Sequence, residues 1–398
     1  MTMLPVAEAQ ARLLALGRPL PIERVPLLDA LGRWTAEPVI ATRTQPAFDL
    51  SAMDGYALAF ANLPGPWRVV REIAAGGLPG AAIGAHEAVR IFTGAPLPPG
   101  ADTILIQEEA RRDGDRLALA GEGPRCVGHS VRRRGYDFAA GDVLIAPGVA
   151  LTPARIALAA AGGHATLPVR RRPRVAIVST GDELVPPGAA TPGATLPSSN
   201  APMLAALLAG RADTIDHGIV RDDRPALAQT FAAAAAGADI LVTTGGASVG
   251  DHDLVRPALA DAGATLDFWK VAMRPGKPIM AGRLGDALVV GLPGNPVSAF
   301  VTAMLFLLPL AAALAGAADP LPAVRRARLA APVSPVGNRD AYLRGRWHED
   351  GVAALDGQDS SGLAALAQVE LLIRRPAAAP AAAAGDIVEI LSVPHPGA

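Results

Sequence analysis

The sequence predicts a multidomain α/β protein with a three-layer, mostly parallel sheet. Its 398 residues exceed one ordinary domain, and 51% apolar with 18% charged residues gives enough core material to argue against disorder. From residue 174 onward, β-branched runs that end in glycine-bearing turns alternate with helical stretches. Such alternation is typical of a parallel sheet with helices on both faces.

The first part of the chain has a different texture. Residues 4–32 carry spaced leucines that favour helix, interrupted by two prolines. Residues 46–138 indicate a β-rich domain, with short strands expected at 67–70, 88–92 and 103–106. Within 139–170 a helix is predicted from Thr152-Pro153, because Thr followed by Pro is a common helix start.

The second part carries the sheet. Strands are predicted at 174–178, 239–243 and 287–290, with helices near 200–210 and 224–237. The arginine-rich stretch 170–174 reads as a boundary, since the formal net charge of −1 gives no general attraction to nucleic acid or to acidic membranes. After residue 320, short strands predict a small β domain.

Two features bear on the compartment. The single cysteine, Cys126, excludes an internal disulfide and a cysteine-rich zinc site, and the N-terminus does not read as a signal peptide. The uncharged segment 296–318 is long enough to cross a membrane, but Pro309 interrupts it and Ala and Gly dilute it. We therefore expect a buried helix in a cytoplasmic protein.

The lysines of the chain are its most unusual feature. Of 36 basic residues only Lys270 and Lys277 are lysines, which leaves 34 arginines. A compact ammonium next to Gly276 suits close approach to a phosphate or another tetrahedral oxyanion better than the wide guanidinium fork does. The alternative is a pair of surface lysines with no special role.

The predicted strand ends form the candidate site. Ligands of such sheets bind beyond the carboxyl ends of the strands, and glycines there expose backbone N–H groups to oxyanions. Carboxylates that could hold Mg²⁺ follow the same strands, although helix capping explains such residues equally well. No Ser-His-Asp arrangement, His/Cys metal set or Walker-type loop is present in the sequence. The acids are Asp182, Glu183, Asp222, Asp223, Asp251 and Asp253.

A second group of polar residues lies in the N-terminal half. Acidic and small residues surround a turn at Asp54-Gly55, a predicted strand ends near Thr93, and the arginines of 132–134 precede Asp137. Arginine clusters suit oxyanions through bidentate hydrogen bonds. Ordinary turns and solvated faces account for each of these features equally well.

Six motifs in one order identify a family resemblance. The chain closely resembles the MoeA family of molybdopterin molybdenumtransferases, also seen in the E domain of gephyrin and in a plant counterpart. The likeness runs from near residue 4 to the C-terminus. The motifs are Ser51-Ala-Met-Asp-Gly-Tyr-Ala57, Thr93-Gly-Ala-Pro-Leu-Pro98, Ser179-Thr-Gly-Asp-Glu-Leu184, Gly245-Gly-Ala-Ser-Val-Gly250, Arg274-Pro-Gly-Lys-Pro278 and Leu292-Pro-Gly-Asn-Pro296.

The resemblance implies four domains in an elongated homodimer. A helical linking domain would comprise 1–45 with 139–170, and a β-rich domain 46–138. A MoaB/Mog-like molybdopterin-binding α/β domain would comprise 171–320, and a small β-barrel 321–398. The implied reaction inserts molybdate into adenylylated molybdopterin, with Mg²⁺-dependent cleavage of the phosphoanhydride and release of AMP. An adenylyltransferase is the expected upstream partner, and neither nucleic acid nor membrane is expected.

The resemblance also assigns residues to roles. Those near metal and pyrophosphate would be Glu183, Asp222 and Asp253, which are also the candidate Mg²⁺ ligands. Molybdate and phosphate would be received by Lys270, Arg274 and Lys277, with Arg344 and Ser360 as weaker matches. The residues expected to enter from a partner subunit are Asp54, Thr93, Arg132 and Asp137. The pterin and nucleotide loops would contain Gly181, Gly245, Gly246, Ser248, Pro293, Gly294 and Asn295.

Departures from the family pattern leave two alternatives. Tyr136 stands where the family usually has Glu, and Ala247 where Val is usual. A related adenylyltransferase family shares the sheet but lacks the Ser51–Ala57 motif, and its glycine turn normally reads Gly-Gly-Thr-Gly. A non-catalytic pterin-binding or scaffold paralogue is the other alternative.

Overall fold

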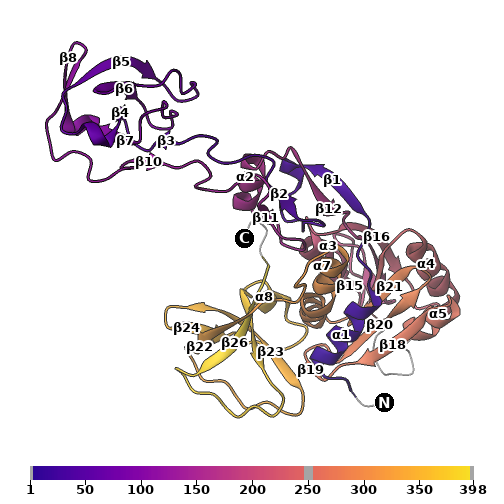
Figure 1. Ribbon diagram of the computed structural model, residues 1–398. Helices are drawn as coiled ribbons and strands as arrows, with labels where there is room; N and C mark the ends of the chain where they lie inside the picture. The colour runs from indigo at the N-terminus through magenta and orange to yellow at the C-terminus, as the bar shows by residue number, and fades with distance from the viewer. Residues whose placement is uncertain (1–2, 246–253, 395–398) are drawn as a thin grey trace.

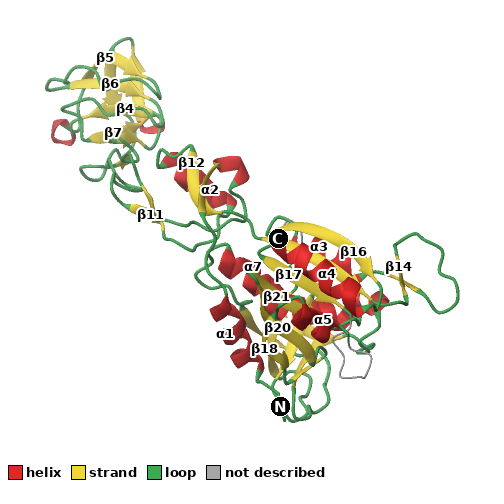
Figure 2. Cartoon of the chain, turned by 90° about the vertical axis from the view of Figure 1, so that its right-hand side faces the viewer, coloured by secondary structure: helices red, strands yellow, loops and turns green. Residues whose placement is uncertain are grey.

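The structure is a computed structural model that describes residues 3–245 and 254–394 (Figure 1). The molecule is elongated, with a β-rich domain at one end and the large α/β domain at the other. Figure 2 shows the same separation from the side, with helices on both faces of the large sheet. The predicted multidomain α/β fold is confirmed.

The large sheet has six strands and is mostly parallel. Its order is β16 (Asp213–Val220), β13 (Arg174–Thr180), β17 (Ile240–Thr244), β21 (Ala287–Leu292), β20 (Pro278–Leu284) and β18 (Thr265–Lys270). The first three pairings are parallel, whereas β20 and β18 run antiparallel to their neighbours. The three strands predicted from the sequence are β13, β17 and β21.

Alternate residues of β13 face two different cores, as a strand covered on both faces requires. Val175 and Ile177 pack in one core with α3 (Asn200–Leu208) and the long apolar helix. Ala176 and Val178 pack in the other core with α4 (Arg224–Ala236) and α5 (Val255–Asp261). This is the predicted three-layer arrangement.

The uncharged segment forms one continuous helix inside the protein. It comprises α6 (Pro296–Thr302), a π-helical turn (Ala303–Leu307) and α7 (Leu308–Leu314). In the most apolar stretch of this helix, 89% of the residues are buried, as expected of a core helix. Pro309 has no N–H to donate to the Leu305 carbonyl, and the side chain of Gln10 donates to that oxygen instead at 2.8 Å. Gln10 belongs to α1 (Val6–Leu16), which packs on the same core.

The helix predicted at 4–32 is shorter than expected. It ends at Leu16, and after the two prolines the chain forms β1 (Ile22–Pro26), antiparallel to β12 (Thr166–Arg170). Proline withholds its N–H and disfavours helix in the residue before it, which explains the change. Residues 27–29 form a short 3₁₀ turn.

The connecting region contains two short strands and a helix. The strands β2 (Val39–Ile40) and β11 (Val143–Ile145) pair antiparallel. The predicted helix is α2 (Pro153–Ala161), and the hydroxyl of Thr152 accepts a hydrogen bond from Arg155 N at 3.3 Å.

The β-rich domain is a six-stranded sheet with short 3₁₀ turns. Its order is β7 (Thr103–Ile106), β4 (Gly55–Leu58), β6 (Glu87–Ile91), β5 (Trp67–Ile73), β9 (Arg116–Leu119) and β8 (Ala110–Asp113). All three strands predicted there are present. A separate pair joins β3 (Leu50–Ser51) to β10 (Val131–Arg132).

The C-terminal domain is the predicted small β domain. Its strands are β22 (Val324–Arg328), β23 (Asp340–His348), β24 (Gly351–Ala354), β25 (Leu371–Arg375) and β26 (Ile387–Ser392), with a short helix α8 (Leu363–Leu366). A β-bridge between Leu329, which follows β22, and Val352 of β24 joins the first of these strands to the hairpin of β23 and β24. The sheet is extended by β19 (Met273–Arg274), which pairs with β23 and joins this domain to the α/β domain.

Candidate functional site

The predicted glycine-bearing turns meet at one edge of the large sheet. β13 ends at Thr180, β17 at Thr244 and β21 at Leu292, and all three run in the same direction. Gly245 has a φ of +104°, and a side chain there would collide with the Thr180 carbonyl oxygen. Glycine is therefore required for this close approach.

The turn after β21 packs directly against Gly245, the residue that follows β17. A Cβ atom on Gly294 would lie 3.4 Å from the Cα of Gly245. Pro293, Gly294 and Asn295 then lead into α6. Gly246 and Ser248, which were also predicted for this edge, lie outside the described residues.

Three carboxylates gather beside the first strand end. The Asp222 backbone N–H donates to Asp182 Oδ1 at 3.2 Å. The Glu183 carboxylate folds over Gly181, where an added Cβ would collide with it. Burial raises the pKa of Asp222, and the negative charges of Asp182 and Glu183 raise it further. Asp253, the third acid assigned by the family resemblance, lies outside the described residues.

Asp223 has a different function from its neighbour. Its carboxylate accepts a hydrogen bond from Ala226 N at 2.9 Å and caps α4. The capping alternative considered for the acids therefore explains Asp223 but not Asp222. Mg²⁺ prefers oxygen ligands, and a cation would relieve the repulsion between these negatively charged carboxylates. Glu183 and Asp222 therefore fit a Mg²⁺ ion.

The two lysines lie at the same edge of the sheet as the glycine turns. The strand register pairs Met280 with Gly291, and Lys270 with Pro278, so the start of β20 and the end of β18 lie beside the end of β21. Val271 N donates to the Lys277 carbonyl at 3.1 Å and closes the loop between them. Both lysines are half-buried, and Arg274 in this loop is exposed.

Gly276 explains how this loop packs. Its φ is +101°, and a Cβ there would collide with the methyl group of Thr302 on α6. The loop thus lies directly against the long helix, with Lys277 next to the contact. The close approach of an oxyanion to Lys277 stays a prediction.

The C-terminal domain places Ser360 beside the turn that follows β21. The side chain of Asn295 donates to Ser360 Oγ at 2.9 Å, and Val297 N donates to the Ser360 carbonyl at 3.2 Å. Ser360 therefore contacts the turn after β21 and the first turn of α6.

Arg344 differs from its prediction. Its side chain is only 1% exposed, and its terminal nitrogens donate to the carbonyls of Asp359 and Gly357, each at 2.7 Å. The side chain of Gln358 accepts a hydrogen bond from Arg344 N and donates one to the Arg344 carbonyl. In this structure Arg344 holds the loop that carries Ser360 rather than facing an anion. No sequence pattern indicates this role, because buried and exposed arginines look alike in a chain that uses arginine throughout.

The second group of residues lies in the β-rich domain. Asp54 Oδ1 accepts hydrogen bonds from the backbone N–H and the hydroxyl of Thr93, both at 2.8 Å. These bonds lower the pKa of Asp54. Arg132 and Asp137 are exposed on the neighbouring segment. Figures 1 and 2 place this domain far from the strand ends of the same chain.

Arg90 supports the turn that carries Asp54. Its guanidinium lies 5.2 Å from the ring centre of Tyr56 and 4.8 Å from that of Phe92, and it donates to the Gly55 carbonyl at 3.0 Å. The sequence analysis did not single out Arg90. A lone arginine in a strand carries no signal that would have identified it.

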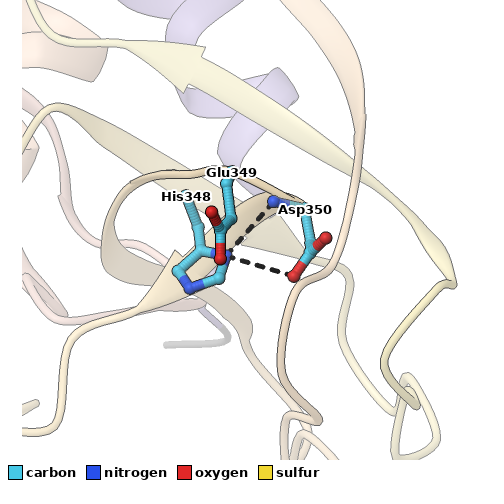
Figure 3. Close-up of side chains that lie close together, drawn as sticks. All are labelled: His348, Glu349 and Asp350. Carbon is cyan, nitrogen blue, oxygen red and sulfur yellow. Dashed lines mark hydrogen bonds and ion pairs between the residues drawn. The ribbon is translucent and has the colours of Figure 1, made fainter.

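One further acidic group lies on the turn between β23 and β24. His348, Glu349 and Asp350 are exposed, and Asp350 N donates to His348 Nδ1 at 3.2 Å (Figure 3). They are at the opposite end of β23 from the pairing with Arg274, so they do not belong to the strand-end site. Their proximity follows from being consecutive in a hairpin turn.

The sheet is open and mostly parallel, and acids, glycine turns and cations lie at its strand ends. These features define the class of protein: a multidomain α/β protein with a polar ligand site at the carboxyl edge of its sheet. A family model described as "MoeA N-terminal region (domain I and II)" matches residues 4–163, and one described as "Probable molybdopterin binding domain" matches residues 176–313.

Whole relatives agree with these models. A molybdopterin molybdenumtransferase of Nostoc sp. is 38% identical over 389 residues, which cover 94% of this chain and 89% of that protein. One from Haemophilus influenzae is 36% identical over 320 residues, covering 79% and 78%. The crystal structure of a molybdopterin biosynthesis MoeA protein from Pyrococcus horikoshii matches with a TM-score of 0.85 and 26% identity, covering 98% of this chain and 100% of that one. The chain belongs to the MoeA family.

Proposed function

We propose that this chain is a molybdopterin molybdenumtransferase of molybdenum cofactor biosynthesis. It takes adenylylated molybdopterin and molybdate, inserts the metal, cleaves the phosphoanhydride and releases AMP. Its membership of the MoeA family supports a transferase of this pathway. The observation that carries the proposal is the order of groups along one sheet edge: carboxylates at β13 and β16, glycine turns in the middle, and lysines at β20 and β18.

The width of this edge suits an elongated, phosphate-containing substrate. Three inter-strand spacings separate β13 from β20, or roughly 14 Å at about 4.8 Å per spacing. A substrate lying across the strand ends would have its phosphoanhydride near the carboxylates and its other end near the lysines. The glycine turns offer backbone N–H groups without side chains in the way.

Mg²⁺ fits the acidic end. Glu183 and Asp222 would hold it, with Asp182 beside them, and Asp253 remains a predicted ligand. When bound, Mg²⁺ would neutralise charge on the phosphoanhydride oxygens. Asp222 has the clearest reason to bind a cation, because its pKa is raised by burial and by two neighbouring carboxylates.

The cationic end would receive molybdate. Molybdate is a dianion, and Lys270 ends β18 while Arg274 and Lys277 lie in the short connection from β18 to β20. The loop Gly357–Ser360, held by Arg344, would bring the Ser360 hydroxyl to the same region through Asn295.

A second copy of the chain would complete the site. Figures 1 and 2 place the β-rich domain at the other end of the molecule from the α/β domain. This separation supports our proposal of a homodimer with shared active sites. Asp54, Thr93, Arg132 and Asp137 would then face the substrate from the partner. We place the reaction in the cytoplasm, and an adenylyltransferase that makes the adenylylated pterin would act upstream.

The test is AMP release from adenylylated molybdopterin with Mg²⁺, with and without molybdate. Lys277→Ala is compared with Arg325→Ala, which removes a positive charge from the exposed strand β22. We expect molybdate-dependent release by the wild type and by Arg325→Ala. Lys277→Ala should lose on the order of 100-fold in rate, because a close charge on the reacting group is lost.

Two other results would point to the alternatives. ATP consumption with unmodified molybdopterin would identify an adenylyltransferase. Tight pterin binding without AMP release would identify a binding or scaffold paralogue. Tyr136→Glu would then be the first variant to test for restored AMP release.

A further inference from the structure

We propose that Asn200 is a positioning residue for this reaction, because it fixes the ends of β17 and β21 relative to each other. The inference rests on the proposed function, since the edge that Asn200 organises is the proposed substrate-binding edge. Asn200 is the first residue of α3, and neither the sequence motifs nor the family resemblance drew attention to it.

The carboxamide of Asn200 links two strand ends. Its Nδ2 donates to Thr244 Oγ1 at the end of β17 and to the Gly294 carbonyl after β21, each at 2.7 Å. The orientation of the amide is fixed by chemistry, because a backbone carbonyl only accepts and the nitrogen must face it. Within 3–245 and 254–394, Asn200 is the side chain that hydrogen bonds to both of these strand ends.

The ladder between β17 and β21 ends at the pair Thr244 and Leu292, so it does not hold Gly245 and Gly294, which lie beyond it. Gly245 and Gly294 approach each other with no side chains of their own, since a Cβ added to Gly294 would lie only 3.4 Å from the Cα of Gly245. Glycine gives the backbone the freedom that close substrate approach requires, but it gives no side-chain contact that would set the spacing. The two hydrogen bonds of Asn200 supply that restraint.

Docking of α3 alone does not account for Asn200. The helix is already held by Ala201, Leu204 and Leu208, all fully or nearly fully buried in the core. Asn200 is itself 9% exposed, and its Oδ1 has no hydrogen-bond partner among the described residues. Burying an unsatisfied acceptor costs free energy that a small apolar residue would avoid. We infer that the residue is kept for the two bonds that its nitrogen makes.

The test compares two side-chain amides that each donate to a backbone carbonyl, Asn200 buried and Gln10 half-buried. Asn200→Asp keeps the shape but places a carboxylate oxygen against the Gly294 carbonyl. Gln10→Glu is the matched control, because Gln10 donates to the Leu305 carbonyl on the same hydrophobic core but away from the strand ends. Thr244→Val removes the other acceptor of Asn200 with little change in shape, and serves if Asn200→Asp does not fold.

AMP release is measured as kcat and KM on the full-length chain, together with the melting temperature. We expect Asn200→Asp to lose on the order of 100-fold in kcat/KM, as a displaced binding edge would, and Thr244→Val about tenfold. Gln10→Glu should keep its activity while losing as much melting temperature as Asn200→Asp. The inference would be overturned if Asn200→Asp were as active as Gln10→Glu. If Asn200→Asp does not fold, the same comparison is made with Thr244→Val.

Failure of the proposed function gives a separate result. If the wild type releases no AMP, the proposed function is wrong, and molybdopterin affinity then becomes the readout for Asn200. An affinity about tenfold weaker in Asn200→Asp than in Gln10→Glu supports the positioning role. Equal affinities overturn it.

Discussion

Thr93 donates two hydrogen bonds to one carboxylate oxygen of Asp54, although the residues are 39 positions apart. Thr93 follows β6 and Asp54 precedes β4, and these strands pair antiparallel. The bond from the Thr93 backbone is the main cause that lowers the pKa of Asp54, and the bond from its hydroxyl is the second. Asp54 thus stays ionised to a lower pH than a free aspartate does.

Thr93→Val should shift the acidic limb of the activity profile to higher pH. The variant keeps the backbone bond but loses the hydroxyl bond, so the pKa of Asp54 rises toward its ordinary value. The pH dependence of AMP release measures this, with Thr103→Val as control, because Thr103 makes a hydroxyl bond of the same length to Asp102. An unchanged limb in Thr93→Val would mean that ionised Asp54 takes no part in the reaction.

Arg344→Met should destabilise the C-terminal domain and weaken molybdate use. The carbonyls of Gly357 and Asp359 would lose hydrogen bonds from a charged donor, which should cost about 1.5–3 kcal/mol of unfolding free energy. Because the same loop presents Ser360, the KM for molybdate should also rise. Urea unfolding and AMP release are measured against Arg346→Met, which changes an exposed arginine on the same strand. Equal effects of the two substitutions would contradict the loop-holding role.

Mg²⁺ should stabilise the protein through Asp222. The folded-state pKa of Asp222 is raised, so ionisation of this group destabilises the fold as pH rises through that pKa. A bound cation removes this penalty and adds binding free energy. We therefore expect Mg²⁺ to raise the melting temperature at pH 7 and to have less effect near the pKa of a free aspartate.

Asp222→Asn separates the two contributions. Without Mg²⁺ it should melt at a higher temperature than the wild type at pH 7, because one repelling charge is gone, and its response to Mg²⁺ should be smaller. Asp319→Asn, an exposed acid with no contact to this group, is the control. A full Mg²⁺ response in Asp222→Asn would place the ion elsewhere.

The sequence predicted the parts of the site that depend on backbone pattern. Strands β13, β17 and β21 read as β-branched runs, and parallel strands necessarily bring their glycine turns to one edge. The lysines could be placed at this edge only from the structure, because β20 and β18 are antiparallel and their register decides where Lys270 lies.

Side-chain environment was the part that the sequence could not supply. Arg344 and Asn200 depend on long-range hydrogen bonds to carbonyls, and nothing local distinguishes them from other arginines or from a helix cap. Asp222 and Asp223 are adjacent and identical in type, yet one caps α4 and the other joins a carboxylate cluster. Only the packing of β16 and α4 against β13 separates their roles.

The arginine-rich boundary leads to the last prediction, which concerns acid stability. Arg171 makes a bidentate pair with Asp239, with both N–O distances at 2.6 Å, and Arg174 N adds a third bond to that carboxylate at 2.7 Å. Burial alone would raise the pKa of Asp239, but the bonds from Arg171 and Arg174 lower it below its ordinary value. A depressed folded-state pKa gives stability that is present above the unfolded-state pKa and is lost as pH falls through the folded-state pKa.

Asp239→Asn should therefore destabilise the protein by about 1–3 kcal/mol at pH 7. The loss of stability should become progressively smaller as the pH falls below the pKa of a free aspartate. Asp261→Asn is the matched control, because Asp261 makes a bidentate pair with Arg224 of similar length at an exposed position, where such pairs contribute little. Urea unfolding from pH 7 to pH 3 measures both. An equal, small effect of the two substitutions would show that burial adds nothing to the Arg171–Asp239 pair. The stretch 170–174 would then contribute no more to the stability of the fold than an exposed run of arginines.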